Sequence, residues 1–98
     1  MIVLFVAHLG QIVATPGALI ALAAADTSPS TLLRRHASGD WGDLNAHDRA
    51  ANDAALRDGS RLLSAYLVAQ GVTVWVITEA ADEDSHRAAT TLLLPEEY

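Results

Sequence analysis

The sequence predicts an α+β fold, in which an antiparallel β-meander of three to four strands packs against about three short N-terminal helices. Residues 62–79 read as two strands around a tight turn at Gln70-Gly71, because they are rich in the aromatic and β-branched residues that suit a pleated surface. Both faces of the second strand are largely apolar. A two-stranded ribbon is marginal alone in water, so the rest of the chain must cover it.

Three short helices are predicted from their start signals. Thr15-Pro16 and Ser28-Pro29 each place a capping hydroxyl before a proline at the first helical position. Asn45 can cap a third helix over residues 46–58, which Gly59 ends. The first two helices carry leucines at helical spacing, so each buries one apolar stripe.

Two further strands are predicted near the ends of the chain. The opening residues 1–14 read as extended and β-rich, with Ile12 to Ala14 as the clearest strand. Thr90 to Leu94 most simply pairs with Val72 to Thr78 as a meander, and Pro95 ends it because proline cannot donate to the ladder. The first and last strands can leave an exposed sheet edge, which favours a homodimer.

The length and composition indicate one domain that spans residues 1–98, because no repeat, linker or low-complexity tract divides the 98 residues. The chain has no cysteine, so disulfides and thiolate sites are excluded, which fits a cytoplasmic protein. The first 25 residues are apolar, but polar residues and Pro16-Gly17 interrupt them and no Lys or Arg precedes Arg34. A signal peptide or membrane helix is therefore not expected.

The charge balance bears on the class of partner. Six basic residues oppose twelve acidic ones, giving a formal net charge of −6, and there is no lysine. Direct nucleic-acid binding is not expected, because a basic footprint for phosphate contacts is missing. A larger host protein, or a nucleoprotein complex, with a basic surface is the kind of partner that this charge favours.

A metal site is weighed at one cluster of imidazoles and carboxylates. Two histidines and three carboxylates within a dozen residues could bind zinc or a harder cation, although their spacing matches no recognised motif. The alternative is that the acids cap helix ends, which we favour, and no metal or cofactor is expected. The cluster consists of His36, Asp40, Asp43, His47 and Asp48.

Three other side chains have two interpretations each. Trp41 could anchor a partner, or it could be a plug that covers one end of the sheet, and the plug is favoured because large aromatics in small domains are mostly buried. Trp75 lies in the middle of a strand and is expected in the core. Asn52 lies one turn before Leu56, and it is expected to be a buried amide that ties its helix to a strand or loop.

Nucleophilic catalysis is not expected. Ser60, Ser64 and Thr78 lie in or near strands, but the sequence has no Gly-x-Ser-x-Gly elbow and no histidine in a position that suggests a base. A small metal-dependent or hydrolytic enzyme that uses His36, His47 and nearby carboxylates is the alternative to a non-catalytic protein.

Acidic residues provide the last candidate site. One loop contains three acids, and two more follow the final strand, so they could converge at one rim of the sheet and steer a basic partner. The other interpretation is a solvated surface that keeps the protein soluble. With the Trp41 loop, the candidate partner-binding residues are Asp40, Trp41, Asp43, Asp82, Glu83, Asp84, Glu96 and Glu97.

Several segments together resemble a known family. They are GQIVATPGAL, LLRRHASGDWGDL, RAANDAAL, RLLSAY, VWVITEA and TTLLLPEEY, which cover nearly the whole chain after residue 9. The family comprises small bacterial proteins encoded mainly on plasmids and integrative elements, often called plasmid-related proteins or, misleadingly, type I restriction methylase subunits. This chain differs in a longer, more apolar opening over residues 1–7 and in an apparent insertion at Asp82 to Ser85.

The resemblance implies a genomic setting rather than a reaction. Nothing in the sequence resembles the cofactor pocket or catalytic loop that a methylase requires. Small proteins of mobile elements often counter host defences, including restriction and CRISPR systems. We therefore expect a non-catalytic interaction protein that binds and inhibits or modulates a host complex of this kind.

Overall fold

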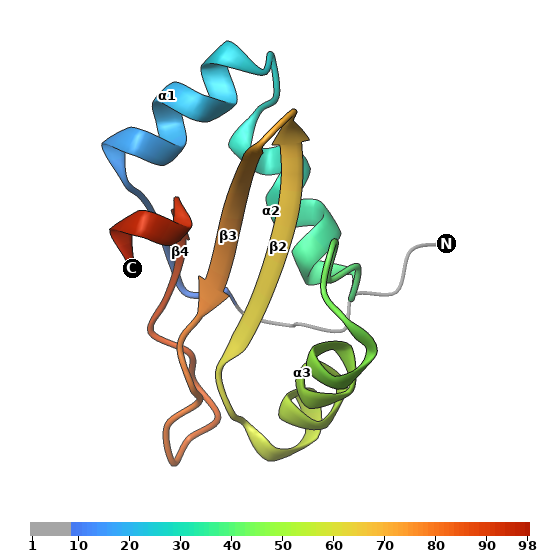
Figure 1. Cartoon of the computed structure of the whole chain (residues 1–98). Helices are drawn as coiled ribbons and strands as arrows, with labels where there is room; N and C mark the ends of the chain where they lie inside the picture. The colour runs from blue at the N-terminus through green and yellow to red at the C-terminus, as the bar shows by residue number, and fades with distance from the viewer. Residues whose placement is uncertain (1–8) are drawn as a thin grey trace.

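The computed structural model describes residues 9–98, so the extended structure expected for residues 1–8 lies outside the described part. The elements fall in the predicted order, with the three helices between the first strand and the other three (Figure 1). They are β1 (Gln11–Ala14), α1 (Pro16–Ala24), α2 (Pro29–Ala37), α3 (Ala46–Asp58), β2 (Leu62–Ala69), β3 (Val72–Thr78), β4 (Ala89–Leu93) and a 3₁₀ helix, η1 (Pro95–Glu97).

The four strands form one mixed sheet in the order β1-β4-β3-β2. The predicted antiparallel pairs β2–β3 and β3–β4 are both present. The prediction of a purely antiparallel meander is wrong at β1, which pairs with β4 in parallel. Parallel neighbours need a long crossover, and here the three helices and the β2–β3 hairpin together provide it.

The helix starts follow the predicted capping chemistry. The side chains of Thr15, Ser28 and Asn45 each accept a hydrogen bond from a backbone amide three residues later. Gly59 ends α3 with a φ of 82°, a left-handed conformation in which glycine has no steric penalty. Local signals of this kind therefore fix where each helix begins and where α3 ends.

The main core lies between the sheet and the first two helices. Figure 1 shows α2 behind β2 and β3, and α1 beside the upper end of the sheet. Side chains that alternate along the strands point to this helix-covered face. The buried residues that pack together here are Ala18, Leu22, Leu32, Tyr66, Val74, Val76 and Leu92.

A smaller cluster joins the loop after α2 to α3. Trp41 is only 5% exposed and packs with Ala55 and Leu62. Its indole Nε1 donates to Asp53 Oδ1 at 3.0 Å, as a buried indole requires. The interpretation of Trp41 as a plug is confirmed.

The outer edge of β2 is occupied by side chains and a loop. Asn52 holds Leu63 at both backbone groups, accepting from its amide at 3.1 Å and donating to its carbonyl at 2.6 Å. The next two amides that face outward, those of Ala65 and Leu67, donate to the Trp41 carbonyl and to Asp43 Oδ2. The expectation that Asn52 ties its helix to a strand is therefore confirmed, and this edge is closed to a further strand.

Candidate functional site

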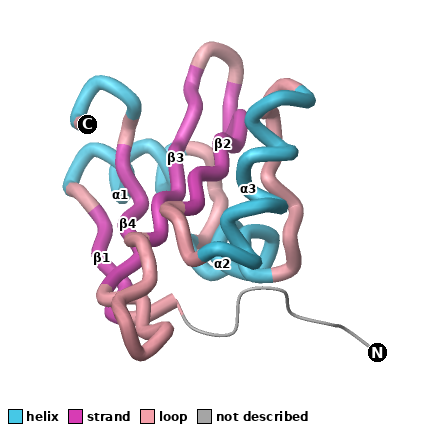
Figure 2. The backbone as a smooth tube through the Cα atoms, turned by 90° about the horizontal axis from the view of Figure 1, so that it is seen from below, coloured by secondary structure: helices cyan, strands magenta, loops and turns pink. Residues whose placement is uncertain are grey.

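The second face of the sheet is not covered by a helix among residues 9–98, and α3 only borders it along β2 (Figures 1 and 2). We call it the open face. Most antiparallel sheets with one solvated face carry polar residues there, whereas this face is largely apolar. Leu67 is 59% exposed on it, and Leu63, Trp75 and Thr91 are half-buried. The expectation that Trp75 belongs to the core is therefore wrong.

Two aromatic rings and a guanidinium gather on the open face. The rings of Trp75 and Tyr98 meet edge to face, with their centroids 5.7 Å apart. The guanidinium of Arg61 lies 5.4 Å from the centre of the Tyr98 ring and donates to the Tyr98 hydroxyl. Tyr98 is 69% exposed. We call Arg61, Trp75 and Tyr98 the aromatic–arginine cluster.

A groove of about 400 Å³ adjoins this cluster. One wall is α3, which contributes Asp48 and Ala51, and the floor includes Leu63 and Trp75 of the open face. The site therefore combines a shallow apolar surface with residue types that dominate binding energy at protein interfaces. It offers a place for a partner side chain.

The predicted residues around Trp41 have structural tasks instead. Asp40 forms a salt bridge with Arg35 at 2.6 Å and accepts the Gly42 amide at 3.1 Å. The hydrogen bond from Arg35 lowers the pKa of Asp40, and the Gly42 amide adds to this effect. Asp43 closes the β2 edge. Both carboxylates form hydrogen bonds within the chain, and these bonds help to fix the conformation of the loop.

The acidic residues at the two ends of β4 do not converge. Asp82, Glu83 and Asp84 lie in the loop before β4, whereas Glu96 and Glu97 follow it. Figure 1 shows that loop at the opposite end of the sheet from η1. The idea of one acidic rim is wrong, because β4 is extended and places its two ends far apart.

Glu97 has a specific role at the start of α1. Its Oε1 accepts from the Thr15 hydroxyl and, at 2.8 Å, from the Leu94 amide. Thr15 is the residue that caps α1, and a carboxylate is favourable at a helix N-terminus. The hydrogen bonds lower the pKa of Glu97, with the largest effect from Thr15. Glu97 thus fastens the C-terminal segment to the fold.

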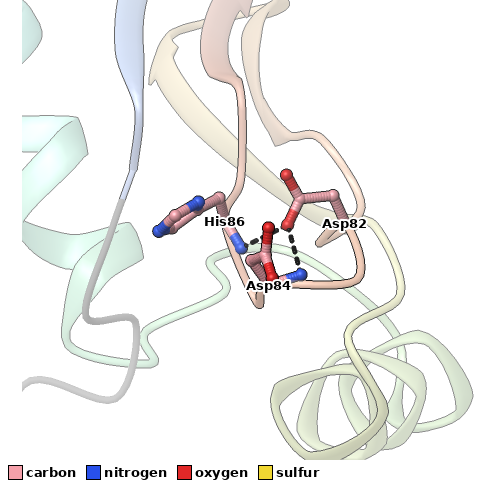
Figure 3. Close-up of side chains that lie close together, drawn as sticks. All are labelled: Asp82, Asp84 and His86. Atoms are coloured by element: carbon pink, nitrogen blue, oxygen red, sulfur yellow. Dashed lines mark hydrogen bonds between the residues drawn. The ribbon is translucent and has the colours of Figure 1, made fainter.

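The loop before β4 holds the one group of three possible metal ligands among residues 9–98, Asp82, Asp84 and His86. Figure 3 shows the Asp82 carboxylate facing backbone amides, and its Oδ1 accepts from those of Asp84 and His86 at 2.9 Å each. These bonds lower the pKa of Asp82. The three residues are exposed, and this hydrogen bonding shapes the loop.

The cluster weighed as a metal site is not brought together. The side chain of His47 is 92% exposed and lies 3.5 Å from Asp48. His36 is fully buried, with Nδ1 2.6 Å from Ser64 Oγ and Nε2 2.8 Å from Thr78 Oγ1. Both of its ring nitrogens are occupied, so His36 and His47 form no joint site.

The buried hydrogen bonds around His36 run in one direction. The Thr90 hydroxyl donates to the Leu9 carbonyl at 2.6 Å, so it must accept from Thr78 at 2.8 Å. Thr78 then has no proton left for His36, whose Nε2–H must donate to it. Nδ1 therefore accepts from Ser64. Each hydrogen-bond donor among these four side chains therefore has an acceptor.

No histidine was expected in the position of a base for a strand hydroxyl, but the structure places His36 Nδ1 2.6 Å from Ser64 Oγ. A serine next to an imidazole is the pattern of nucleophilic catalysis, yet Ser64, His36, Thr78 and Thr90 are all 0% exposed. Burial lowers the pKa of His36 to about 4, with a further contribution from the positive charge of Arg87. A neutral, sealed imidazole of this kind stabilises the core rather than meeting a substrate.

One signal for this network is present in the sequence. Ser64, Thr78 and Thr90 all occupy positions where the apolar alternation of their strands points to the helix-covered face. His36 shares one side of its helix with leucines. Hydroxyls in the apolar register of adjacent strands indicate a buried polar network, because each needs a partner.

Burial also raises the pKa of the Tyr66 phenol, to about 12. The hydroxyl donates to the Asp40 carbonyl at 2.6 Å, and the Arg35 guanidinium lies 4.5 Å from the ring centre. Tyr66 is thus a structural anchor for the Trp41 loop.

A scan of protein-family models and searches of curated proteins and of solved structures find no match to this chain. No helix among residues 9–98 is long and apolar enough to cross a membrane.

Proposed function

We propose that this chain is a non-catalytic protein-interaction module that binds its partner through the open face. The observation that carries the proposal is the aromatic–arginine cluster beside the groove along α3. Tryptophan, tyrosine and arginine are the residue types most enriched at binding hot spots. Around the cluster, Leu63, Leu67 and Thr91 of the open face, which no helix among residues 9–98 covers, provide further contact area.

The class of partner follows from charge and from the family resemblance. The net charge of −6 favours a larger protein or nucleoprotein complex with a basic surface. The resemblance to proteins of plasmids and integrative elements supports a host defence complex, such as a CRISPR or restriction system, as that partner. In this proposal the chain inhibits or modulates the complex by occupying part of its surface.

The test is capture from host cells that carry an active defence system, at moderate and at high salt. We expect Tyr98→Ala and Arg61→Ala to reduce the retained partner by about tenfold, the effect of losing about 1.4 kcal/mol at a hot spot. Both side chains are exposed, so the fold should tolerate these changes. Phage plaquing on the same cells reports whether the defence is inhibited.

Arg34→Ala is the matched control, because Arg34 is exposed on α2 on the other side of the sheet. It should capture as much partner as the unchanged chain. Equal capture by Tyr98→Ala, Arg61→Ala and Arg34→Ala would contradict binding through the open face.

A further inference from the structure

We propose that β1 pairs with β1 of a second copy of this chain, so that the sheet continues across a two-fold axis. This inference concerns the far edge of the sheet and does not depend on the partner of the open face. The strand that pairs with β1 is then β1 of a second, identical chain.

The backbone of β1 has an unpaired side. The Gln11 amide donates to the carbonyl of Ala88, just before β4, and the amide of Thr15, just after β1, donates to the carbonyl of Leu92 in β4, at 3.0 Å each. Alternation along a strand then turns the amide and carbonyl groups of Ile12 and Ala14 outward. Since β1 ends the sheet, no strand among residues 9–98 pairs with these groups. They form a template for one more strand.

The two edges of the sheet differ in a way that limits the assembly. The β2 edge is closed by Asn52, the Trp41 carbonyl and Asp43. Within the described residues 9–98, the β1 edge is therefore the one that can extend the sheet. Two copies that join through their single open edges consume both edges, which gives a closed dimer rather than a filament.

Charge makes the β1 edge the part of the surface that best admits a second copy. Each copy has a net charge of −6, so two copies repel each other over most of their surface. No Lys, Arg, Asp or Glu precedes Asp26, and β1 and α1 both lie within this uncharged part. A like-charged copy can approach here without placing charges opposite one another.

Apolar side chains flank the edge strand. Ile12 is 45% exposed and Val13 is 42% exposed on β1, while Leu19 and Ile20 of the following helix are 47% and 71% exposed. Figure 2 shows β1 as the outermost strand, with α1 on the same side of the molecule. Pairing with a second copy provides partners for the backbone and removes apolar surface from water.

The register follows from the two outward-facing residues. Antiparallel pairing places Ile12 of one copy opposite Ala14 of the other, and the two-fold axis passes beside Val13. The two Val13 side chains then face each other on the same side of the sheet. A lysine at this position sets two like charges directly opposite, which destabilises a cross-strand pair.

The test is the mass of the purified full chain, measured by sedimentation equilibrium over a range of concentrations. We expect a dimer, and we expect Val13→Lys to weaken it by about tenfold or more. Leu67→Lys is the matched control, because Leu67 is a comparably exposed residue of the open face at the closed β2 edge. It should leave the dimer unchanged.

A second variant addresses the backbone. Ile12→Pro removes an amide that faces outward, and proline is tolerated on an edge strand when its missing N–H faces solvent. We expect it to give a folded monomer with an unchanged circular dichroism spectrum. In the dimer of the unchanged chain, the Ile12 amide should exchange its hydrogen slowly, and faster on dilution.

Three results would overturn the proposal. The first is a monomer with a rapidly exchanging Ile12 amide. In that case the β1 edge is unpaired in the free chain and can instead pair with an extended segment of another protein. The second is a monomer with a protected Ile12 amide at every concentration, which indicates cover from within the same chain. The third is a dimer that Leu67→Lys disrupts as strongly as Val13→Lys, which places the contact on the open face.

Discussion

His36 makes the stability of this protein depend on pH. Its pKa is about 4 in the folded chain, against an ordinary value of 6.5. Between these values the unfolded chain binds a proton that the folded chain does not bind. The free energy of unfolding therefore falls as the pH drops below 6.5 and levels off below about 4. The loss from this group is on the order of 3 kcal/mol.

Urea titrations between pH 5 and pH 7 measure this dependence. His36→Gln is the comparison, because a glutamine does not titrate, and its stability should vary less with pH over this interval. Both proteins contain the exposed histidines His47 and His86. The contribution of these histidines to the pH dependence therefore cancels when the two profiles are compared. Parallel pH profiles would show that His36 does not carry the effect.

Thr78 is the central link of the buried network. Thr78→Val keeps the shape of the side chain but leaves the Nε2–H donor of His36 without its acceptor, which is 2.8 Å away. An unsatisfied buried donor costs about 1–3 kcal/mol, so the free energy of unfolding should fall by that amount in urea denaturation.

Thr91→Val is the control for this change. Thr91 belongs to the neighbouring strand but lies half-buried on the open face. Substitutions away from such networks usually stay within about 0.5 kcal/mol. A Thr91→Val variant as destabilised as Thr78→Val would refute the special role of the buried hydroxyl.

At the scale of elements, α3 protects β2 through Asn52. Asn52→Ala removes both hydrogen bonds to Leu63 and leaves its backbone groups without these partners. We expect a loss of about 1–3 kcal/mol in the free energy of unfolding. We also expect faster thioflavin-positive aggregation, because an unprotected edge pairs with other chains.

Arg57→Ala provides the reference in the same helix, since Arg57 is exposed near its C-terminal end. Its stability should stay within about 0.5 kcal/mol of the unchanged chain. If Asn52→Ala aggregated no faster than Arg57→Ala, the amide would not be what guards the β2 edge.

The elements also show what sequence reasoning could reach. The helix starts at Thr15, Ser28 and Asn45 and the β2–β3 hairpin were predictable, because each depends on neighbours along the chain. The parallel pairing of β1 with β4 was not predictable, since it joins segments separated by all three helices. No local pattern encodes which edge a distant strand will take.

The same limit explains the errors at the candidate site. Both faces of β3 are apolar, so alternation alone could not reveal that the helices cover the face of Val74 and Val76 and leave Trp75 half-buried. The sequence left open whether the acidic residues meet at one rim, because their position depends on the direction of β4. The open face and the His36 network emerge only when strands are placed side by side.

At the scale of the whole molecule, three surfaces have different tasks. The helix-covered face holds the core and the His36 network, the β1 edge is proposed to join a second copy, and the open face is proposed to bind a host protein. In such a dimer the two open faces belong to one continuous sheet. In this proposal, the net charge of −6 favours the approach of a target with a basic surface.

The central claim is that the partner contacts the open face, and photo-crosslinking in host cells with an active defence system tests it most directly. A benzoyl-phenylalanine at position 98 lies on the open face beside Trp75 and Arg61, and the same group at position 34 lies on α2. We predict one dominant crosslink to a component of the defence complex from position 98 and none from position 34. Crosslinks of equal yield from both positions, or from position 34 alone, would contradict the account.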